Sequence, residues 1–129
     1  MGHHAGLSRL DTPEGVVEDL NRCSIGIELV NVNGNLFPYT EQQYRSLEGV
    51  LRYLTAAHPA LDSPDRLIGH EEIAGWRGKV DPGLRFDWGR ILSAVYPGRS
   101  RQAPPQRACP VELRDAAAAL VRSIGLSDE

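Results

Sequence analysis

The chain has 129 residues and a formal net charge of −3 at pH 7, with 41% hydrophobic and 24% charged residues. This length fits one domain, and the composition is ordinary for a globular protein. The acidic balance gives no reason to expect a nucleic acid or an anionic membrane as a partner. No apolar run approaches the length of a membrane span, and the start lacks a secretory signal, so a cytoplasmic location is predicted.

The first 23 residues are expected to be irregular, with at most a short helical turn near 16–20, because glycine, threonine and proline interrupt any longer pattern. In the segment 24–32, SIGIELVNV, larger apolar residues alternate with small or polar ones. This alternation places Ile25, Ile27 and Leu29 on one face. This period of two predicts a β-strand, which the following NGN sequence ends with a turn.

Thr40 begins the clearest predicted helix, because Gln43 three residues later completes a capping-box pattern. Apolar residues recur at helical spacing along it, at Tyr44, Leu47, Leu51 and Leu54. Pro59 closes this region. A short buried strand is then expected at 65–70, DRLIGH, followed by a glycine-rich loop, and a second helix is expected at 86–95.

Three parts of the chain are distinguished by composition: a domain at 1–96, an exposed linker at 97–110 and a helix with its tail at 111–129. The late arginines lack interleaved aromatic residues, and we interpret them as part of a solvated linker: Arg90, Arg99, Arg101 and Arg107. The last helix either docks on the domain or begins a further binding module.

Cys23 and Cys109 form no metal-binding spacing; free thiols are expected, with a disulfide as the alternative.

Glu28 lies in the middle of the strand predicted at 24–32, on the same face as Ser24 and Gly26. Such a face is typical of a strand exposed to solvent, where a glutamate stays hydrated and does not reduce stability. The strand alone favours this interpretation. The alternative is a carboxylate held on a rigid strand beneath a cleft, where it serves as a general base.

His70 ends the second predicted strand, and Asp81 follows it in a loop that is rich in glycine. Glycine lets the backbone fold back tightly, so the carboxylate can return to the histidine. Nitrogen and oxygen ligands suit zinc, and Lys79 lies close enough to Asp81 to direct a cation at a developing oxyanion. The alternative is a polar loop without chemistry, because a histidine and an aspartate at this spacing are a weak signal alone.

The combination of segments is more specific than any one of them. NRCSIGIELVN, PYTEQQYRSLEGVLRYL, IGHEEIA and KVDPGLRFDW occur in this order. Together they resemble the zinc-dependent N-acetylmuramoyl-L-alanine amidases of the AmpD type, within the superfamily of type-2 amidases and peptidoglycan recognition proteins. The opening HHAGLS is similar to the family's WHAG-S segment, with His3 in place of tryptophan. The resemblance covers about residues 3–95.

The resemblance implies an α/β fold with a central mixed β-sheet flanked by helices, and one Zn²⁺ at an end of the sheet. His70 and Asp81 match two zinc ligands of the family. The implied reaction is hydrolysis of the amide between the lactyl group of N-acetylmuramic acid and L-alanine. Peptidoglycan or a muropeptide is therefore the expected substrate and partner, with no nucleic acid and no membrane involved.

Further roles are carried over by the same motifs. Glu28 matches the glutamate that takes the proton of the attacking water, and Lys79 matches the lysine that stabilises the oxyanion. Candidate substrate contacts are His4, Asn21 and Arg77. The loop that holds Arg77 departs from the family pattern, because it lacks a proline and carries one extra residue.

The start of the chain also departs from the family. The family's first histidine ligand lies on an amino-terminal strand, followed by a helix, before the WHAG segment, whereas this chain begins almost at HAG. We therefore expect an amino-terminally truncated domain with an exposed sheet edge, which a homo-oligomer would cover. Because catalytic zinc normally has three protein ligands, the alternative function is an inactive domain that binds peptidoglycan fragments without turnover.

Overall fold

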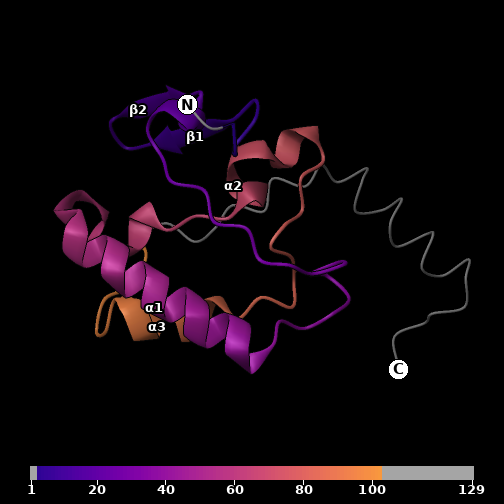
Figure 1. Cartoon of the computed structure of the whole chain (residues 1–129). Helices are drawn as coiled ribbons and strands as arrows, with labels where there is room; N and C mark the ends of the chain where they lie inside the picture. The colour runs from indigo at the N-terminus through magenta and orange to yellow at the C-terminus, as the bar shows by residue number, and fades with distance from the viewer. Residues whose placement is uncertain (1–2, 103–129) are drawn as a thin grey trace, which may run out of the picture.

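The computed structural model describes residues 3–102, which combine helices with a small antiparallel sheet (Figure 1). The strands and helices are β1 (Arg9–Thr12), β2 (Gly15–Glu18), α1 (Glu41–Ala57), α2 (His70–Ala74) and α3 (Trp88–Val95). Short 3-10 turns lie at Leu20–Arg22, Pro59–Leu61, Pro64–Arg66 and Gly75–Arg77. The expected mixture of helix and strand is confirmed. None of the described helices is long and apolar enough to cross a membrane.

Residues 9–18 form a β-hairpin, so the expectation of an irregular start was wrong. β1 and β2 pair antiparallel, and Thr12 lies opposite Gly15 across a two-residue turn. The Thr12 hydroxyl donates to the Gly15 carbonyl at 2.7 Å, and the φ of 132° at Gly15 favours glycine. These turn residues were expected to interrupt regular structure, although a two-residue turn equally joins two strands.

The helix predicted from Thr40 is confirmed in its start, its buried face and its end. The Thr40 hydroxyl accepts from the Gln43 N–H at 3.2 Å, and the Gln43 side chain accepts from the Thr40 N–H at 2.9 Å. This capping box satisfies two amide groups at the start of α1. The side chains that α1 buries are Tyr44, Leu47 and Leu51. The helix ends at Ala57, before Pro59.

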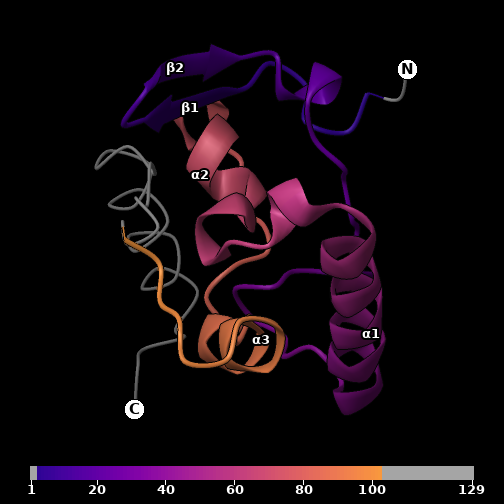
Figure 2. The same ribbon diagram turned by 90° about the vertical axis from the view of Figure 1, so that its left-hand side faces the viewer.

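Helix α3 packs against α1, as Figure 2 shows. It begins at Trp88 because the Asp87 carboxylate accepts from the Arg90 N–H at 2.9 Å, two residues after the predicted start. Ile91 and Val95 of this helix point into the core. The buried side chains of this core are Tyr39, Tyr44, Leu47, Leu51, Phe86, Ile91, Val95 and Tyr96.

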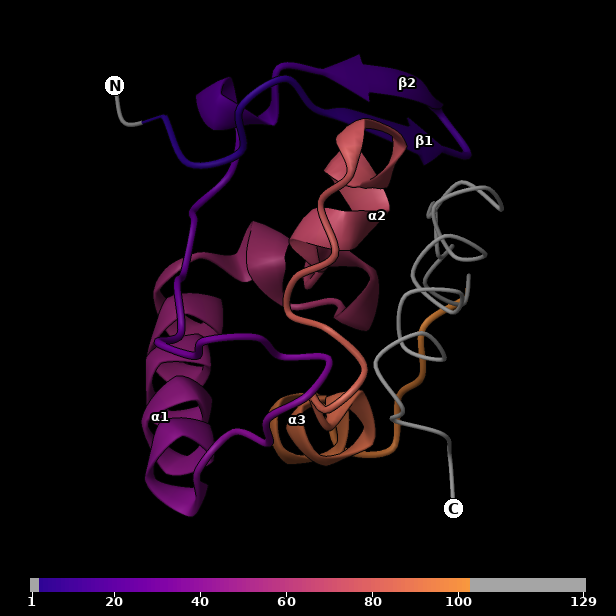
Figure 3. The same cartoon turned by 90° about the vertical axis from the view of Figure 1, so that its right-hand side faces the viewer.

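The hairpin lies across α2, at the other end of the molecule from α1 and α3 (Figure 3). A second and smaller cluster of buried residues joins these elements: Ala5, Leu20, Ile73 and Ala74. The start of α2 therefore lies between two packed cores. Its first residue is His70, so this arrangement places a predicted zinc ligand between them.

Residues 24–32 are extended, but they are not a strand of any sheet in the described part of the chain. No backbone–backbone hydrogen bond involves them within residues 3–102; the Val30 carbonyl instead accepts from the Gln43 side chain at 2.6 Å. The β-strand predicted from the alternation of side chains is therefore not formed within the described residues. A strand also needs a neighbour for its ladder, and no described segment supplies one.

The strand predicted at 65–70 was also wrong. Pro64–Arg66 is a 3-10 turn, and α2 begins at His70. Carbonyl groups of this segment accept from the Arg101 guanidinium, at Pro64 and at Leu67, where a neighbouring strand would otherwise bind. The predicted central mixed sheet is therefore not formed by the residues that the structure describes, whose sheet has two strands.

Three of the four late arginines form ion pairs with the domain. The pairs are Arg90 with Glu41 and Glu48, Arg99 with Asp62, and Arg101 with Glu72. The interpretation as a solvated linker was therefore wrong for Arg90, which lies in α3, and for Arg101, whose side chain is 6% exposed, whereas Arg99 stays exposed. Residues 103–129 lie outside the described residues, and with them Arg107, Cys109, most of the predicted linker and the predicted last helix. Cys23 is exposed and free.

Candidate functional site

His70, the first residue of α2, contacts the carboxylate of Asp81. Its Nδ1 atom lies 3.0 Å from Asp81 Oδ2. The backbone carbonyl of Asp81 also accepts from the Glu71 N–H at 2.9 Å, so two bonds join the start of α2 to this loop. The His70 side chain is 22% exposed and that of Asp81 is 61% exposed. The structure thus brings together the two residues predicted as zinc ligands.

The loop of Asp81 is held from its other side by the chain around Gly34. The Tyr39 hydroxyl donates to the Pro82 carbonyl at 2.7 Å. Gly83 has a φ of 90°, and a Cβ atom there would lie 2.4 Å from the backbone carbon of Gly34. Burial raises the pKa of Tyr39, and the Asp81 carboxylate raises it further, so the phenol remains a hydrogen-bond donor.

Arg77 holds the amino-terminal segment against His70. Its guanidinium donates to the carbonyls of Leu7 at 2.7 Å and Ala5 at 2.9 Å, and lies 3.4 Å from His70 Nε2. His70 Nε2 also lies 3.3 Å from the Ala5 carbonyl, so this ring nitrogen faces both the guanidinium and a carbonyl oxygen while Nδ1 faces Asp81. Arg77 was predicted as a substrate contact. That role stays a prediction, beside the structural role seen here.

Asn21 orders the segment that carries His4. Its Oδ1 accepts from the N–H groups of His4 at 2.9 Å and Ala5 at 2.8 Å, and its Nδ2 donates to the Gly6 carbonyl at 3.1 Å. The Asn21 side chain is buried, whereas His4 is exposed and contacts the Ser24 hydroxyl at 2.8 Å. The substrate roles of both residues stay predictions, and His4 is the accessible one.

One large cleft, of about 1240 Å³, connects most of the predicted site residues. Those that line it are His4, Glu28, His70, Lys79 and Asp81. Glu28 reaches the cleft from the extended segment 24–32 and is exposed, while Lys79 is half-buried and follows the turn after α2. A carboxylate, an ammonium group and a histidine–aspartate pair therefore share one opening with a largely apolar lining.

The donor atoms of this cleft fit zinc in kind but not in number. His70 and Asp81 offer a nitrogen and an oxygen, which zinc accepts. Among residues 3–102, however, no group of three histidine, cysteine or acidic side chains is placed to hold a metal ion. Both ring nitrogens of His70 also face protein groups. The described residues alone therefore do not make a complete catalytic zinc site.

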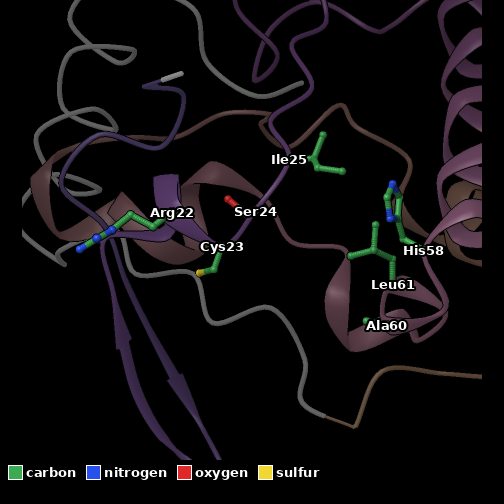
Figure 4. Close-up of a pocket in the computed structure, with 7 residues that line it drawn as sticks. All are labelled: Arg22, Cys23, Ser24, Ile25, His58, Ala60 and Leu61. Carbon is green, nitrogen blue, oxygen red and sulfur yellow. The ribbon is translucent and has the colours of Figure 1, made fainter. Parts of the chain in front are cut away.

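A second and smaller pocket, of about 330 Å³, lies between the chain at 22–25 and the turn after α1 (Figure 4). Its lining residues are Arg22, Cys23, Ser24, Ile25, His58, Ala60 and Leu61. His58 is exposed at the carboxyl end of α1. None of the predicted site residues lines this pocket, so the large cleft is the better candidate for chemistry.

The fold and the contents of the cleft agree with the comparison of sequences. The chain belongs to the N-acetylmuramoyl-L-alanine amidase family, whose sequence profile matches residues 1–84. Within this family it is similar to the 1,6-anhydro-N-acetylmuramyl-L-alanine amidases AmpD, so the AmpD-type resemblance is confirmed. No solved structure matches the chain significantly.

The similarity to these relatives covers the region of the predicted motifs. Over 92 residues the chain is 39% identical to the protein of Haemophilus influenzae, 41% to that of Salmonella typhimurium strain SL1344 and 40% to that of Escherichia coli K12. These matches cover 71% of this chain, and 46%, 44% and 45% of the relatives. The chain therefore spans less than half the length of these curated relatives.

Two contributors to the site were missed by sequence reasoning. Tyr39 anchors the carbonyl of Pro82, and Arg101 binds Glu72 beside the start of α2. Tyr39 stands in the quoted segment PYTEQQYRSLEGVLRYL, directly before the helix cap, and this position was the available signal. No local signal pointed to Arg101, which follows the last described helix.

Proposed function

We propose that this chain acts as an AmpD-type amidase domain on the amide between the lactyl group of N-acetylmuramic acid and L-alanine. The observation that supports this most is the contact of His70 with Asp81 in the same cleft as Glu28 and Lys79. The names of the relatives suggest a 1,6-anhydro-muropeptide as the substrate class. Intact peptidoglycan is the other form of the same chemical group.

The roles of the side chains follow from their chemistry. Glu28 accepts a proton from the attacking water as the new C–O bond forms, and delivers it to the leaving amine as the amide C–N bond then breaks. Lys79 stabilises the negative charge that develops on the carbonyl oxygen. His4, exposed at the rim, contacts the substrate.

Zn²⁺ is the proposed cofactor, with His70 and Asp81 as two of its ligands. A catalytic zinc ion polarises a carbonyl and lowers the pKa of bound water, and it normally has three protein ligands. The third donor is then supplied from beyond residues 3–102, by this chain or by a second copy in a homo-oligomer. This requirement separates the amidase from the next candidate.

The second candidate function is binding of peptidoglycan fragments without turnover. The incomplete set of metal donors among the described residues favours it. In this case the cleft still binds a muropeptide, and the ammonium group of Lys79 pairs with the carboxylates of that muropeptide. Hydrolysis would be absent even at saturating zinc.

One experiment separates the two functions. The full chain is dialysed with Zn²⁺, its metal content is measured, and it is incubated with an anhydro-muropeptide while mass spectrometry follows release of the L-alanyl peptide. The variants Glu28→Gln and His70→Ala test the site, and Glu18→Gln, on β2 outside the cleft, is the matched control. Release that is lost in the first two variants supports the amidase. Calorimetric binding without release supports the second candidate. If the chain neither releases the peptide nor binds the muropeptide, both proposed functions are contradicted.

A further inference from the structure

We propose that Arg101 is a positioning residue for His70, acting through Glu72 and the backbone of Gly69. The significance of this role for catalysis rests on the proposed function, whereas the positioning itself does not. Arg101 lies in the segment after α3, 29 residues from Glu72 in sequence. The segment therefore contributes to the site, although it lies beyond the residues that the family profile matches.

The ion pair between Arg101 and Glu72 is bidentate and buried. The Arg101 guanidinium donates to Glu72 Oε1 at 3.0 Å and to Oε2 at 3.3 Å. The two side chains are only 6% and 9% exposed. Each other described ion pair includes a side chain that is at least 31% exposed. A buried pair of this geometry fixes both side chains far more firmly than a surface pair does.

The guanidinium of Arg101 also binds two backbone carbonyls. It donates to the carbonyl of Pro64 at 3.3 Å and to that of Leu67, the first residue of the turn before α2 and the residue that follows this turn. Its central carbon lies 5.1 Å from the centre of the Trp88 ring, within the range of a cation–π interaction. Arg101 therefore joins the turn, α2 and α3 at one point.

Glu72 transmits this restraint to the site. Its Oε2 atom accepts from the Gly69 N–H at 2.5 Å, and Gly69 directly precedes His70. A Cβ atom at Gly69 would lie 3.0 Å from Pro82 and 3.1 Å from Trp88, so the backbone is packed tightly here. The start of α2 is thus fixed on one side by Arg101 and Glu72. On the other side the His70 ring meets Asp81.

The chemistry of the two residues makes the restraint specific. Arginine stays charged and offers a planar fork of donors, which the compact ammonium group of lysine cannot reproduce. Removing one partner of a buried pair leaves an unpaired charge, which the protein avoids by rearranging or by admitting water. The rearrangement would move the backbone of Gly69, and with it the ring of His70.

The test measures the ring of His70 directly, with no substrate present. Two-dimensional ¹H–¹³C NMR spectra of the imidazole groups are recorded for the full chain, and the His70 signals are assigned from the spectrum of His70→Ala. The test variants are Arg101→Met, Arg101→Lys and Glu72→Gln. The matched control is Arg99→Met, in the same segment, whose ion pair with Asp62 is exposed. Backbone amide spectra of α1 and α3 show whether each variant is folded.

The expected result is that Arg101→Met and Glu72→Gln shift or broaden the His70 signals while the amide signals of α1 and α3 stay in place. Arg101→Lys should restore the signals only in part, and Arg99→Met should leave them unchanged. Combining Arg101→Met with Glu72→Gln should add little to either, because the two act along one chain of contacts. With an anhydro-muropeptide, kcat should fall by up to about 100-fold, with a smaller change in KM.

Unchanged His70 signals in a folded Arg101→Met protein would overturn the proposal, and so would an equal change in Arg99→Met. If Arg101→Met does not fold, Arg101→Lys and Glu72→Gln decide by the same criterion. A wild-type chain that releases no peptide would contradict the amidase proposal alone, because the NMR result stands without substrate.

Discussion

The phenol of Tyr39 donates a 2.7 Å hydrogen bond to the carbonyl of Pro82, from a residue that stands just before α1 to the residue that follows Asp81. The Tyr39 ring also packs at 5.4 Å, edge to face, against Phe86 in the main core. The position of the Asp81 carboxylate is therefore tied to the core by a single buried side chain. This link can be tested without disturbing the ring packing.

Replacement of Tyr39 by phenylalanine should lower the free energy of unfolding by about 1 kcal/mol, because the Pro82 carbonyl loses its partner while the ring remains. Hydrogen exchange should also become faster at the Glu71 amide, which donates to the Asp81 carbonyl. Denaturant titration and exchange NMR measure the two effects. Exchange at Glu71 as slow as in the wild type would show that Tyr39 does not hold this loop.

Two glycines of the same region separate backbone strain from a steric clash. Gly83 and Gly78 have φ values of 90° and 91°, so alanine should cost about 1–2 kcal/mol at either position. Only at Gly83 would the new Cβ meet backbone, 2.4 Å from Gly34, whereas nothing lies within 4 Å at Gly78. Gly83→Ala should therefore destabilise clearly more than Gly78→Ala in thermal unfolding. Equal losses would contradict the close approach of Gly83 to Gly34.

Replacing Arg77 by lysine should make the amino-terminal segment less ordered. Lysine cannot reproduce the paired bonds to the carbonyls of Ala5 and Leu7, and hydrogen bonds to charged groups each contribute about 1.5–3 kcal/mol. Limited proteolysis should cut the segment around Gly6 sooner in Arg77→Lys. Arg22→Lys, at an arginine without a described side-chain hydrogen bond, is the control. Equal cleavage in both variants would argue against a clamp.

A pH dependence is expected from Glu41, which joins α1 to α3. Hydrogen bonds from Arg90, and then from Arg45, lower the pKa of Glu41 from 4.5 to about 2. The folded state therefore releases this proton more readily than the unfolded state, so the stabilisation is complete above the unfolded pKa and is lost as the pH falls toward 2. Glu41→Gln should lower stability at neutral pH. The difference from wild type should shrink from pH 4.5 downward in denaturant titrations.

That pattern separates the ion pair from a general effect of acid. Both proteins lose stability in acid through their other carboxylates, but only the wild type loses this contribution. A difference between wild type and Glu41→Gln that stays constant over the same range of pH would contradict the role of Glu41. Glu18→Gln, on an exposed strand position, provides the control for an ordinary carboxylate.

Features encoded within a few residues could be predicted from the sequence. The start of α1 was correct because the capping box is formed by Thr40 and Gln43 alone, and its buried face followed from the spacing of apolar residues. The return of Asp81 to His70 was also expected, since glycines and a short loop leave few alternatives. In each case the partners are close in sequence.

Features that need a distant partner could not be predicted in the same way. The alternation at 24–32 predicted a strand that the described residues do not form, because a strand depends on a neighbour that no local pattern specifies. Arg101 reads as one of several linker arginines, and only the folded chain shows that it is buried against Glu72. The hairpin was missed for a different reason, because its turn residues are typical of both loops and hairpins.

The segment 24–32 also affects how readily the protein aggregates in solution. Its exposed apolar side chains are Ile25, Ile27, Val30 and Val32, of which the last two are 90% and 94% exposed. A segment rich in exposed β-branched residues, with one carboxylate, Glu28, and no backbone ladder in the described structure, is the kind from which fibrils nucleate. The rate of aggregation in concentrated solution should therefore depend on segment 24–32 more than on the free energy of unfolding. Light scattering during storage would measure this rate.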